Sequence, residues 1–449
     1  MNELLKTGQV VQTKTSGQPC QVEKFLGGGG QGEVYQARLA GGSFALKWYY
    51  PQTATADQRE TLQNLFKESP PSDAFLWPLD MASASGVKGF GYLMRLREPR
   101  FKGLLDLMSN RIDPTFRVLA TVGLGLADSF FKLHAKGLCY RDISFGNAFF
   151  DPDSGEVLIC DNDNVTTNRS PKVSVLGTPE FMAPEIVRRE TLPSRQTDLY
   201  SLSVLLFFIF HIHHPLKGKR VLSIHCWDLP SQEKMFGTAP LFIFDPSDTS
   251  NRAVDKSVDR DGSTEGGHNA LVYWPIFPQF LRDTFTRAFT TGLKDPEHGR
   301  VLEGEWRKVL SQLRDSIFYC AACGSENFHD PDAVKADGGK PDTCWSCKKE
   351  LQLPFRIRMS RATVMLSHDG KLYPHHLDPS KDFDFANVCA EVNTHPTDPN
   401  IWGLKNCTGE KWVATMPDGS VKDIEPGRSV RLADKTKVHF GKVEGEIRY

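Results

Sequence analysis

The segment CYRDISFGN, at residues 139–147, places an acid and an amide five residues apart, Asp142 and Asn147. It follows a helix-like apolar stripe that ends at Gly137, and it precedes EVLIC, a strand-like run at residues 156–160. Two oxygen-bearing side chains on one short loop can orient a hydroxyl group and hold a cation. Alone, the segment is equally typical of a polar turn between a helix and a strand, so its meaning depends on the motifs around it.

A glycine-rich segment, LGGGGQGEVY at residues 26–35, fits the spacing G-x-G-x-x-G-x-V. A dinucleotide-binding loop with this spacing would run into a helix, whereas EVYQARL continues here as a strand. The pattern therefore predicts a flap whose backbone N–H groups cover phosphates. The glycines of this flap are Gly27, Gly28, Gly29, Gly30 and Gly32.

Lys47 ends the apolar strand-like segment FALK, where a solitary solvent-exposed lysine is unexpected. A lysine in such a place can grip nucleotide phosphates while it pairs with a carboxylate from a helix. The helix-like segment at residues 56–69 offers Glu60 as that partner, because Glu60 lies in its first turns. Glu68 is the alternative, but it stands next to SPP, which ends the helix.

Further motifs follow in order: YRDISFGN, ICDND, GTPEFMAPE and TDLYSLSV. With the glycine-rich segment and Lys47, they make residues 8–315 resemble a eukaryotic-type protein kinase. The resemblance implies a two-lobed fold, with an N-lobe at about 8–96 and a C-lobe at about 97–315, and ATP in the cleft between them.

The resemblance also implies roles for individual residues. Asp142 would accept the proton of a substrate hydroxyl, and Thr178 would hydrogen-bond Asp142. Asn147 and Asp161 would hold Mg²⁺, and Lys47 would hold the phosphates of ATP. The residues expected around the adenine are Val34, Ala45 and Met94.

Other acidic positions have supporting roles or remain alternatives. Asp163 is an alternative metal ligand, but Asp161 is preferred because it directly follows the apolar strand. Asp198 resembles the aspartate that supports the backbone of the catalytic loop. Glu185 resembles a glutamate that is buried against an arginine, for which Arg300 is the candidate.

Three departures from the common kinase pattern bear on activity. Tyr140 replaces a histidine, Asn162 and Asp163 replace Phe and Gly of DFG, and Ser144 replaces a lysine that neutralises the transferred phosphate. The resemblance still implies an ATP-dependent kinase that transfers the γ-phosphate to Ser/Thr of itself and of partner proteins. The alternative is a pseudokinase scaffold that binds nucleotide and partners without transfer.

Regulation by phosphorylation is a further expectation. Arg141 precedes the catalytic aspartate, as in kinases that are switched by a phosphate on the activation loop. Candidate acceptors in that segment are Thr166, Thr167, Ser170 and Ser174.

Two CxxC pairs, CAAC and CWSC, stand twenty residues apart within residues 316–354. This spacing predicts a tetrahedral zinc ribbon with the ligands Cys320, Cys323, Cys344 and Cys347. Four thiolates leave no open position, so the expected role of Zn²⁺ is structural. The alternative is a set of free or disulfide-linked cysteines.

Residues 355–449 show short strand-like runs separated by DG, PG and EG turns, which predicts an all-β sandwich. The segment from Ile401 to Gly441 is similar to the later strands of a forkhead-associated domain, and Asn406 falls where such domains have an asparagine. The arginine-serine signature that reads phosphothreonine is not found. We therefore expect a degenerate interaction module.

Length and composition indicate a multidomain α+β protein of ordinary charge. A chain of 449 residues is too long to fold around one hydrophobic core. Its net charge of -1 favours neither nucleic acid nor a membrane surface as a partner. The N-terminus lacks a signal-like run, and the longest apolar stretch, Leu199–Ile212, is shorter than a membrane span. We expect a cytoplasmic protein, and a zinc-dependent nucleic-acid binder is disfavoured because the ribbon lacks a basic patch beyond KK.

The order of kinase, four-cysteine ribbon and β-sandwich resembles bacterial kinases of the tellurite-resistance-associated phosphorylation triad. That resemblance implies a von Willebrand A domain protein and a metal-dependent Ser/Thr phosphatase as partners, besides protein substrates.

Overall fold

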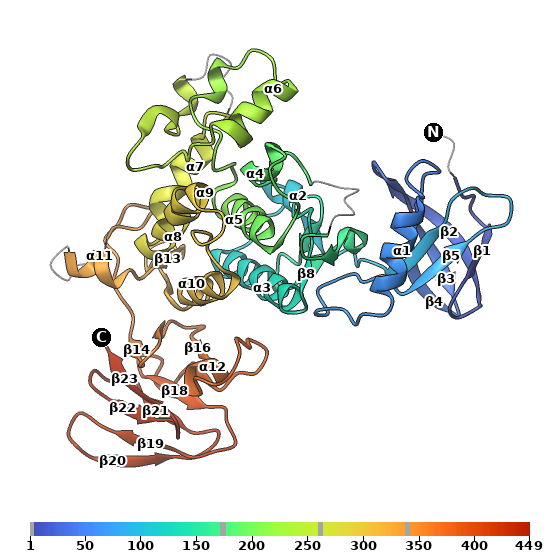
Figure 1. Cartoon of the computed structure of the whole chain (residues 1–449). Coiled ribbons are helices and arrows are strands. Elements are labelled where there is room, and N and C mark those ends of the chain that lie inside the picture. The colour runs from blue at the N-terminus through green and yellow to red at the C-terminus, as the bar shows by residue number, and fades with distance from the viewer. Residues whose placement is uncertain (1–3, 171–176, 259–263, 337–341) are drawn as a thin grey trace. The chain divides into compact units, whose positions relative to one another are not determined.

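The computed structural model describes residues 4–170, 177–258, 264–336 and 342–449. The chain forms two compact units, and their helices and strands are labelled in Figure 1. The first comprises Met1–Pro114, Val122–Leu271 and Phe285–Gly304, and the second comprises Thr115–Thr121, Val272–Thr284 and Glu305–Tyr449.

Six antiparallel strands near the N-terminus close into a barrel in the order β1-β2-β3-β4-β6-β5. Alternating side chains of these strands point inward, and Tyr35, Leu46 and Trp48 are fully buried among them. The strands are β1 (Val10–Thr13), β2 (Pro19–Gly28), β3 (Gly32–Leu39), β4 (Gly42–Tyr49), β5 (Asp80–Ser83) and β6 (Gly91–Arg95).

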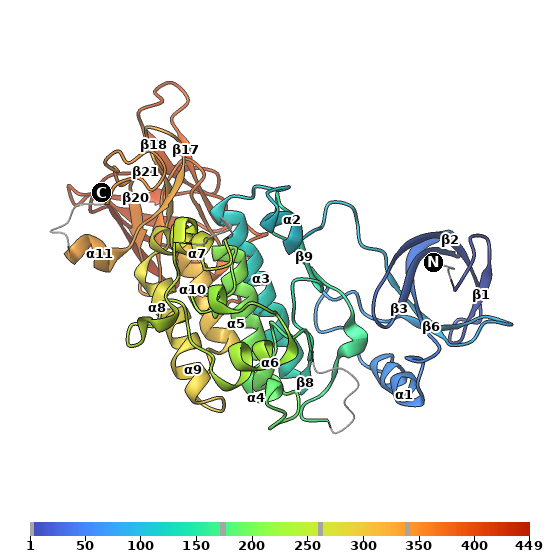
Figure 2. The ribbon, with the colours of Figure 1, turned by 90° about the horizontal axis from the view of Figure 1, so that it is seen from above.

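Helix α1 (Ala56–Leu65) lies beside this barrel (Figure 2). It begins at Thr55, whose side chain accepts a hydrogen bond from the backbone N–H of Gln58. Its buried residues are Gln58, Leu62 and Leu65, which recur at helical spacing and form the inward face. The predicted helix in this segment is confirmed.

The segments after the barrel are mainly helical. The short strands are β7 (Lys102–Gly103), β8 (Leu138–Cys139), β9 (Ala148–Phe150), β10 (Val157–Ile159) and β11 (Thr166–Thr167). The helices are α2 (Leu104–Met108), α3 (Phe116–Ala135), α4 (Pro184–Val187), α5 (Arg195–His211), α6 (Leu229–Gln232), α7 (His268–Tyr273), α8 (Gln279–Phe289), α9 (Thr291–Lys294) and α10 (Glu303–Asp315).

Helix α5 is the core of the first unit. Every residue from Thr197 to His211 is buried, and Ser194 and Thr197 cap the helix reciprocally at its start. The prediction of a buried core helix is thus confirmed. Helix α3 runs beside α5 in both views (Figure 1) (Figure 2). Within the described ranges, α3 is the one helix long and apolar enough to cross a membrane, but 61% of its most apolar window is buried, as in a core helix.

An ion pair that the sequence predicts lies in the same core. Both carboxylate oxygens of Glu185 accept hydrogen bonds from one Arg300 guanidinium nitrogen, at 3.0 and 2.9 Å. Their side chains are only 9% and 2% exposed, and the guanidinium lies 4.8 Å from the ring of Tyr200. This pair ties α4 to the turn before α10, and the predicted partnership is confirmed.

The second unit ends in two antiparallel sheets that share one core. The sheet orders are β15-β14-β23-β22-β19-β20 and β16-β17-β18-β21, and every one of these strands contributes a buried apolar side chain to that core. The strands are β14 (Arg356–Arg358), β15 (Thr363–Met365), β16 (Lys371–Leu372), β17 (Ala390–Thr394), β18 (Trp402–Asn406), β19 (Trp412–Thr415), β20 (Val421–Ile424), β21 (Ser429–Arg431), β22 (Lys437–His439) and β23 (Glu444–Arg448). Strands β12 (Ile317–Tyr319) and β13 (Glu326–Phe328) and helices α11 (Pro331–Ala336) and α12 (Pro374–Leu377) complete the unit.

Asn406 is completely buried at the end of β18. Its amide nitrogen donates to the carbonyls of Glu410 and Ile424, and its oxygen accepts from the backbone and hydroxyl of Thr408. The side chain therefore uses its hydrogen bonds to shape the turn between β18 and β19. It does not face a ligand.

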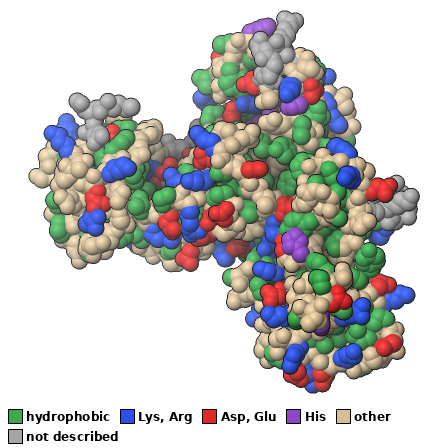
Figure 3. Space-filling model, turned by 180° about the vertical axis from the view of Figure 1, so that it is seen from behind, with side chains coloured by type: hydrophobic (Ala, Val, Ile, Leu, Met, Phe, Trp, Pro, Cys, Tyr) green, Lys and Arg blue, Asp and Glu red, His purple; other side chains and the backbone are tan. Residues whose placement is uncertain are grey.

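Charged side chains of both signs are interspersed on the face of the molecule in Figure 3. This arrangement matches the near-zero formal net charge of -1. Such a surface gives no strong field of one sign to attract a polyanion on that face.

The Glu185–Arg300 pair yields a stability prediction. Glu185→Gln leaves a buried guanidinium without its counter-charge, so we expect the free energy of unfolding to fall by about 3 kcal/mol. Glu190→Gln is the control, because Glu190 pairs with Arg188 on the surface, where solvent screens an ion pair and its contribution to stability is small. Thermal unfolding of both variants measures the effect, and equal losses would contradict the buried role of Glu185.

Candidate active site and four-cysteine site

The loop that carries CYRDISFGN joins β8 to β9, and it is hydrogen-bonded to Asp198 of α5. Both oxygens of Asp198 accept backbone N–H bonds from this loop, from Tyr140 at 2.6 Å and from Arg141 at 3.0 Å. Arg141 has a positive φ of 73°, and its Nε donates to the carbonyl of Asn164 at 2.6 Å. These bonds fix a strained turn that points the next residue, Asp142, toward its partners.

Asp142 is anchored on both carboxylate oxygens. Oδ1 accepts from the backbone N–H and the hydroxyl of Thr178, at 2.9 and 2.8 Å, and Oδ2 accepts from Asn147 at 3.0 Å. Burial raises the pKa of Asp142 above 3.8, although these hydrogen bonds oppose the change. The site thus presents a rigidly oriented carboxylate whose affinity for a proton is increased.

Asn147 and Asp161 are brought together by the backbone. The N–H of Cys160, next to Asp161, donates to the carbonyl of Asn147 at 2.9 Å. The Asn147 amide nitrogen bonds Asp142, so its side-chain oxygen remains an acceptor, and the Asp161 side chain is 40% exposed. An amide oxygen and a carboxylate are hard ligands of the kind that Mg²⁺ takes in proteins, so the donor set fits this ion.

Lys47 lies in a buried acidic cluster. Its Nζ donates to Asp163 at 3.0 and 2.9 Å, to Asp161 at 3.3 Å, and to Gln31 of the glycine-rich loop at 3.1 Å. Burial lowers the pKa of Lys47, but the charges of Asp163 and Asp161 outweigh burial and raise the pKa above 10.5. Lys47 therefore stays charged. Contacts through Asp161 link it to the Asn147 and Asp142 loop.

The carboxylate beside Lys47 differs from the sequence prediction. Helix α1 turns Gln58 toward the cluster, and Glu60 is exposed on another face. In the described part of the chain, the carboxylate with the shortest contacts to Lys47 is therefore that of Asp163, which follows β10, and not that of the predicted Glu60. The helical spacing of Gln58, Leu62 and Leu65 is the sequence signal that identifies the inward face, and the structure shows all three buried.

The flap between β2 and β3 holds the glycines where the sequence predicts. A Cβ at Gly32 would meet the carbonyl oxygen of Trp48 at 2.2 Å, so only glycine fits at that position. Beside Gly27, Gly29 and Gly30 there is open space within 4 Å. The backbone of this flap is therefore accessible on the side of those three glycines.

The predicted adenine residues share one apolar cluster. Ala45 on β4 pairs with Met94 on β6, and both are nearly fully buried. Val34 packs against the same cluster, which also includes Leu158 of β10. The structure thus brings together apolar side chains from both sides of the Lys47 site.

Two residues that depart from the kinase pattern, Tyr140 and Ser144, are held by hydrogen bonds in the structure. The Tyr140 hydroxyl donates to the carbonyl of Cys160, which again ties the loop to the Asp161 segment. Ser144 is buried and its carbonyl accepts from the N–H of Asn147. Of the candidate phosphate acceptors, Thr166 and Thr167 form β11, Ser170 follows them, and Ser174 lies outside the described residues.

A buried ionic network contacts Asp198, the residue that holds the loop at residues 139–147. His134 of α3 contacts Asp198 through Nε2 at 3.0 Å and Glu303 through Nδ1. Arg195 donates to both oxygens of Glu303, at 3.0 and 2.7 Å. Burial lowers the pKa of His134, but its two carboxylate partners raise it above 6.5 overall. Burial raises the pKa of Glu303, but His134 and Arg195 lower it to about 2.

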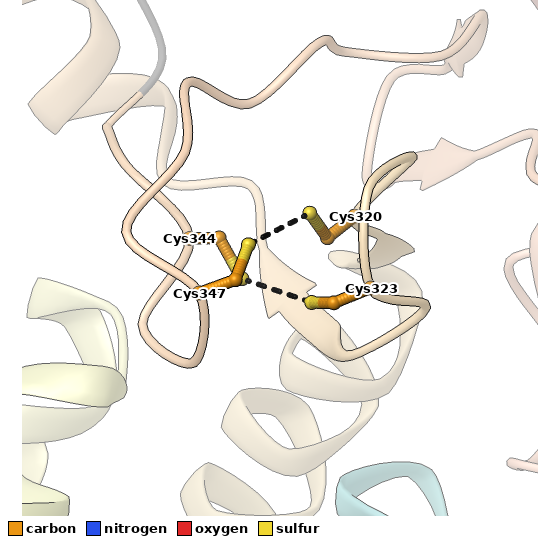
Figure 4. A group of neighbouring side chains, drawn as sticks. All are labelled: Cys320, Cys323, Cys344 and Cys347. Atoms are coloured by element: carbon orange, nitrogen blue, oxygen red, sulfur yellow. Dashed lines mark hydrogen bonds between the residues drawn. The ribbon is translucent and has the colours of Figure 1, made fainter.

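Four cysteines converge in the second unit (Figure 4). Their sulfur atoms all lie within 4.8 Å of one another, and two pairs, Cys320–Cys347 and Cys323–Cys344, are 3.7 Å apart. Four thiolates at about 2.3 Å from a tetrahedral Zn²⁺ lie about 3.8 Å from each other. The set therefore fits a four-coordinate soft metal ion.

The two CxxC turns have the same backbone hydrogen bonds. The N–H of Gly324 donates to the backbone carbonyl of Cys320 at 2.8 Å, and the N–H of Lys348 donates to the backbone carbonyl of Cys344 at 2.9 Å. Both donors have a positive φ, of 76° and 60°. Asn327 also donates to the sulfur of Cys344 at 3.6 Å, as groups around a metal thiolate do. The repeated turn indicates that the backbone, and not only the sulfur atoms, is arranged for ligation.

A second cluster of ligand-type side chains, Asp315, His375 and His376, has a different explanation. The N–H of Tyr373 donates to Nδ1 of His376 at 3.0 Å, which places the ring proton on Nε2. Nε2 lies 3.1 Å from Asp315 and donates to it. A metal ion at Nε2 would need this proton to move to Nδ1, which already faces an N–H donor. The Asp315–His376 pair is therefore a hydrogen-bonded link between α10 and α12.

Comparison with known proteins agrees with this geometry. Residues 100–258 match the family model of the protein kinase domain. The chain is 30% identical over 292 residues to "Serine/threonine-protein kinase 10" of Xenopus tropicalis, which covers 61% of this chain and 28% of that protein. It is 28% identical over 229 residues to "Ribosomal protein S6 kinase alpha-4" of Homo sapiens, which covers 46% of this chain and 28% of that protein. Residues 100–258 are thus similar to a protein kinase domain, and the chain spans 28% of the length of either relative.

The His134–Glu303 contact predicts a window of maximal stability. The lowered pKa of Glu303 gives stability that is complete above about pH 4.5 and is lost as the pH falls toward about 2. The raised pKa of His134 gives stability that is complete below about pH 6.5 and is lost as the pH rises through its folded-state pKa. We therefore expect the melting-temperature difference between the wild type and Glu303→Gln to be largest between about pH 4.5 and 6.5.

Differential scanning fluorimetry from pH 4 to 9 measures this difference. Glu297→Gln is the control, because Glu297 and its partner Arg169 are each 59% exposed. A difference for Glu303→Gln that stays constant across this range would contradict the assignment.

Proposed function

We propose that the protein is an ATP-dependent protein kinase that transfers the γ-phosphate of ATP to Ser/Thr of itself and of partner proteins. The observation that carries the proposal is the anchoring of Asp142 by Thr178 and Asn147. The backbone of Asn147 is bonded to the segment of Asp161, and Asp161 in turn contacts Lys47. The similarity to Ser/Thr kinases supports the choice of acceptor.

Asp142 performs the proton step in this proposal. With Oδ1 held by Thr178 and Oδ2 by Asn147, the carboxylate has one orientation, and it accepts a hydrogen bond from the substrate hydroxyl. As the oxygen of that hydroxyl bonds to the γ-phosphorus of ATP, the bond from this phosphorus to the bridging oxygen breaks and ADP leaves, while the hydroxyl proton passes to the Asp142 carboxylate. The raised pKa of Asp142 favours this transfer.

Asn147 and Asp161 would hold Mg²⁺, which neutralises charge on the phosphate oxygens when it is bound. Lys47 stays protonated and is held at one place by Asp163, so its ammonium offers a fixed positive charge to the phosphates. The flap backbone beside Gly27, Gly29 and Gly30 covers the nucleotide in this proposal. Val34, Ala45 and Met94 supply apolar contact for the adenine.

The activity is tested by labelling the purified protein with radioactive ATP and Mg²⁺. We expect Asp142→Asn to reduce labelling about 10²- to 10⁴-fold, since it removes the proton acceptor but keeps the side-chain shape. Asp153→Asn, an exposed residue in the turn after β9, is the control. Equal labelling of wild type and Asp142→Asn would refute the kinase proposal. Tight ATP binding without labelling would favour the pseudokinase scaffold, which the serine at position 144 supports.

We propose that the four cysteines bind Zn²⁺ and that the ion stabilises the segment between α10 and the sheets. Glu326, three residues after Cys323, accepts from the first N–H groups of α3, Phe116 at 2.5 Å and Arg117 at 3.3 Å. The metal would therefore also fix a carboxylate that caps the start of this core helix.

Elemental analysis is expected to find one equivalent of zinc in the wild type and none in Cys344→Ser. A chelator that removes the ion should lower the melting temperature of the wild type and leave Cys344→Ser unchanged. Cys226→Ser is the control, because Cys226 is exposed and distant in sequence from both CxxC pairs. A full zinc content in Cys344→Ser would contradict the four-thiolate site.

The physiological setting is proposed from the family resemblance alone. We propose a bacterial, cytoplasmic signalling system in which a von Willebrand A domain protein and a metal-dependent Ser/Thr phosphatase are the partners. The two sheets at the C-terminus would be a forkhead-associated-like interaction module. Because Asn406 uses its side-chain hydrogen bonds within its own turn, it supports a module that does not read a phosphate.

A further inference from the structure

Asp163 is the most deeply buried charged residue of the active site. Its side chain is 0% exposed, and Lys47 contacts both of its oxygens. The Tyr92 hydroxyl donates to Oδ1 at 3.0 Å, and the Tyr49 hydroxyl donates to Oδ2. These donors come from β4 and β6 of the barrel, whereas Asp163 belongs to the short helix at Asn162–Asn164, after β10. Donors from the barrel thus surround one carboxylate that comes from the segment after β10.

Helix α1 contributes a further donor to the same carboxylate. Gln58 Nε2 donates to the Tyr49 hydroxyl at 3.0 Å and lies 3.5 Å from Asp163 Oδ2. It also donates to the Asp163 carbonyl at 3.4 Å. The inward position of α1 is therefore filled by an amide that supports Asp163, and the negative charge that balances Lys47 comes from elsewhere.

We propose that Asp163 is the positioning residue that holds Lys47 toward the phosphates of ATP, in place of a carboxylate on helix α1. This inference deepens the proposed kinase function and rests on it. It assigns a duty to the last residue of CDND, where the kinase pattern has a glycine that has no side chain.

Asp161 and Asp163 then have different roles. Asp161 is 40% exposed and makes one longer contact to Lys47, at 3.3 Å, so its carboxylate is free to bind a cation. Asp163 is enclosed and makes the shorter contacts. Because the lysine partner is two residues from the metal ligand, placement of Lys47 and of Asp161 depends on one segment. Helix α1 need not move inward to complete the site.

The test compares Asp163→Asn, Gln58→Glu and Asp163→Gly/Gln58→Glu with the wild type. Two quantities are measured: the Kd for Mg-ATP by calorimetry, and kcat/KM for ATP by labelling. Loss of the charge should weaken Mg-ATP binding and lower kcat/KM by about 10- to 100-fold in Asp163→Asn, because Lys47 then draws Asp161 away from the cation. The double variant returns a carboxylate to α1 and should recover at least about tenfold of this loss.

Asp80→Asn is the matched control. Asp80 is a buried aspartate of the same barrel, but its partners are Thr15 and Ser16. It should lower the melting temperature without changing the Kd for Mg-ATP.

An unchanged Kd in Asp163→Asn, or a loss that the double variant fails to recover although it melts like the wild type, would overturn the inference. The Kd for Mg-ATP tests the role of Asp163 even if the wild type transfers no phosphate. Absence of transfer in the wild type would refute the proposed kinase function but not the role of Asp163.

Discussion

The buried ammonium group of Lys47 constrains the whole active site. A charge removed from water is tolerated only with a nearby counter-charge and satisfied hydrogen bonds, and Asp163 supplies both. The contact joins the strand that carries Lys47 to the segment that carries Asp161. Asp161 is in turn connected to Asn147 through the backbone of Cys160. The ion pair therefore connects Lys47 to Asp161 and Asn147, the residues to which the proposed function assigns phosphate and metal binding.

A second buried carboxylate does the same for the catalytic loop. Asp198 accepts two backbone N–H bonds from this loop, and His134 and Glu303 complete a chain of charges behind it. The strained backbone at Arg141 persists because these bonds outweigh its cost, which is of the order of 1–3 kcal/mol. The proposed function assigns no substrate contact to Asp163 or Asp198, yet Asp163 sets the direction of Lys47 and Asp198 that of the loop before Asp142.

Motif order in the sequence was sufficient to place Asp142, Asn147, Asp161 and Thr178 on neighbouring segments, because each motif carries its own local turn. The core helix α5 was equally predictable from its continuous apolar run. The partner of Lys47 was not, because Asp163 is 116 residues away along the chain and its hydrogen-bond donors include Tyr49 and Tyr92. Such contacts depend on how the barrel packs, which local periodicity does not encode.

We infer that Asp163 holds Lys47 while Asp161 and Asn147 bind the metal ion that accompanies ATP. A crystal structure of the protein with Mg²⁺ and a non-hydrolysable ATP analogue is the decisive test. We expect Lys47 to contact both the phosphates and Asp163 in that structure, with Mg²⁺ on Asp161 and Asn147. A structure in which Lys47 leaves Asp163 for Glu60, or in which Asp163 binds the metal ion, would contradict it.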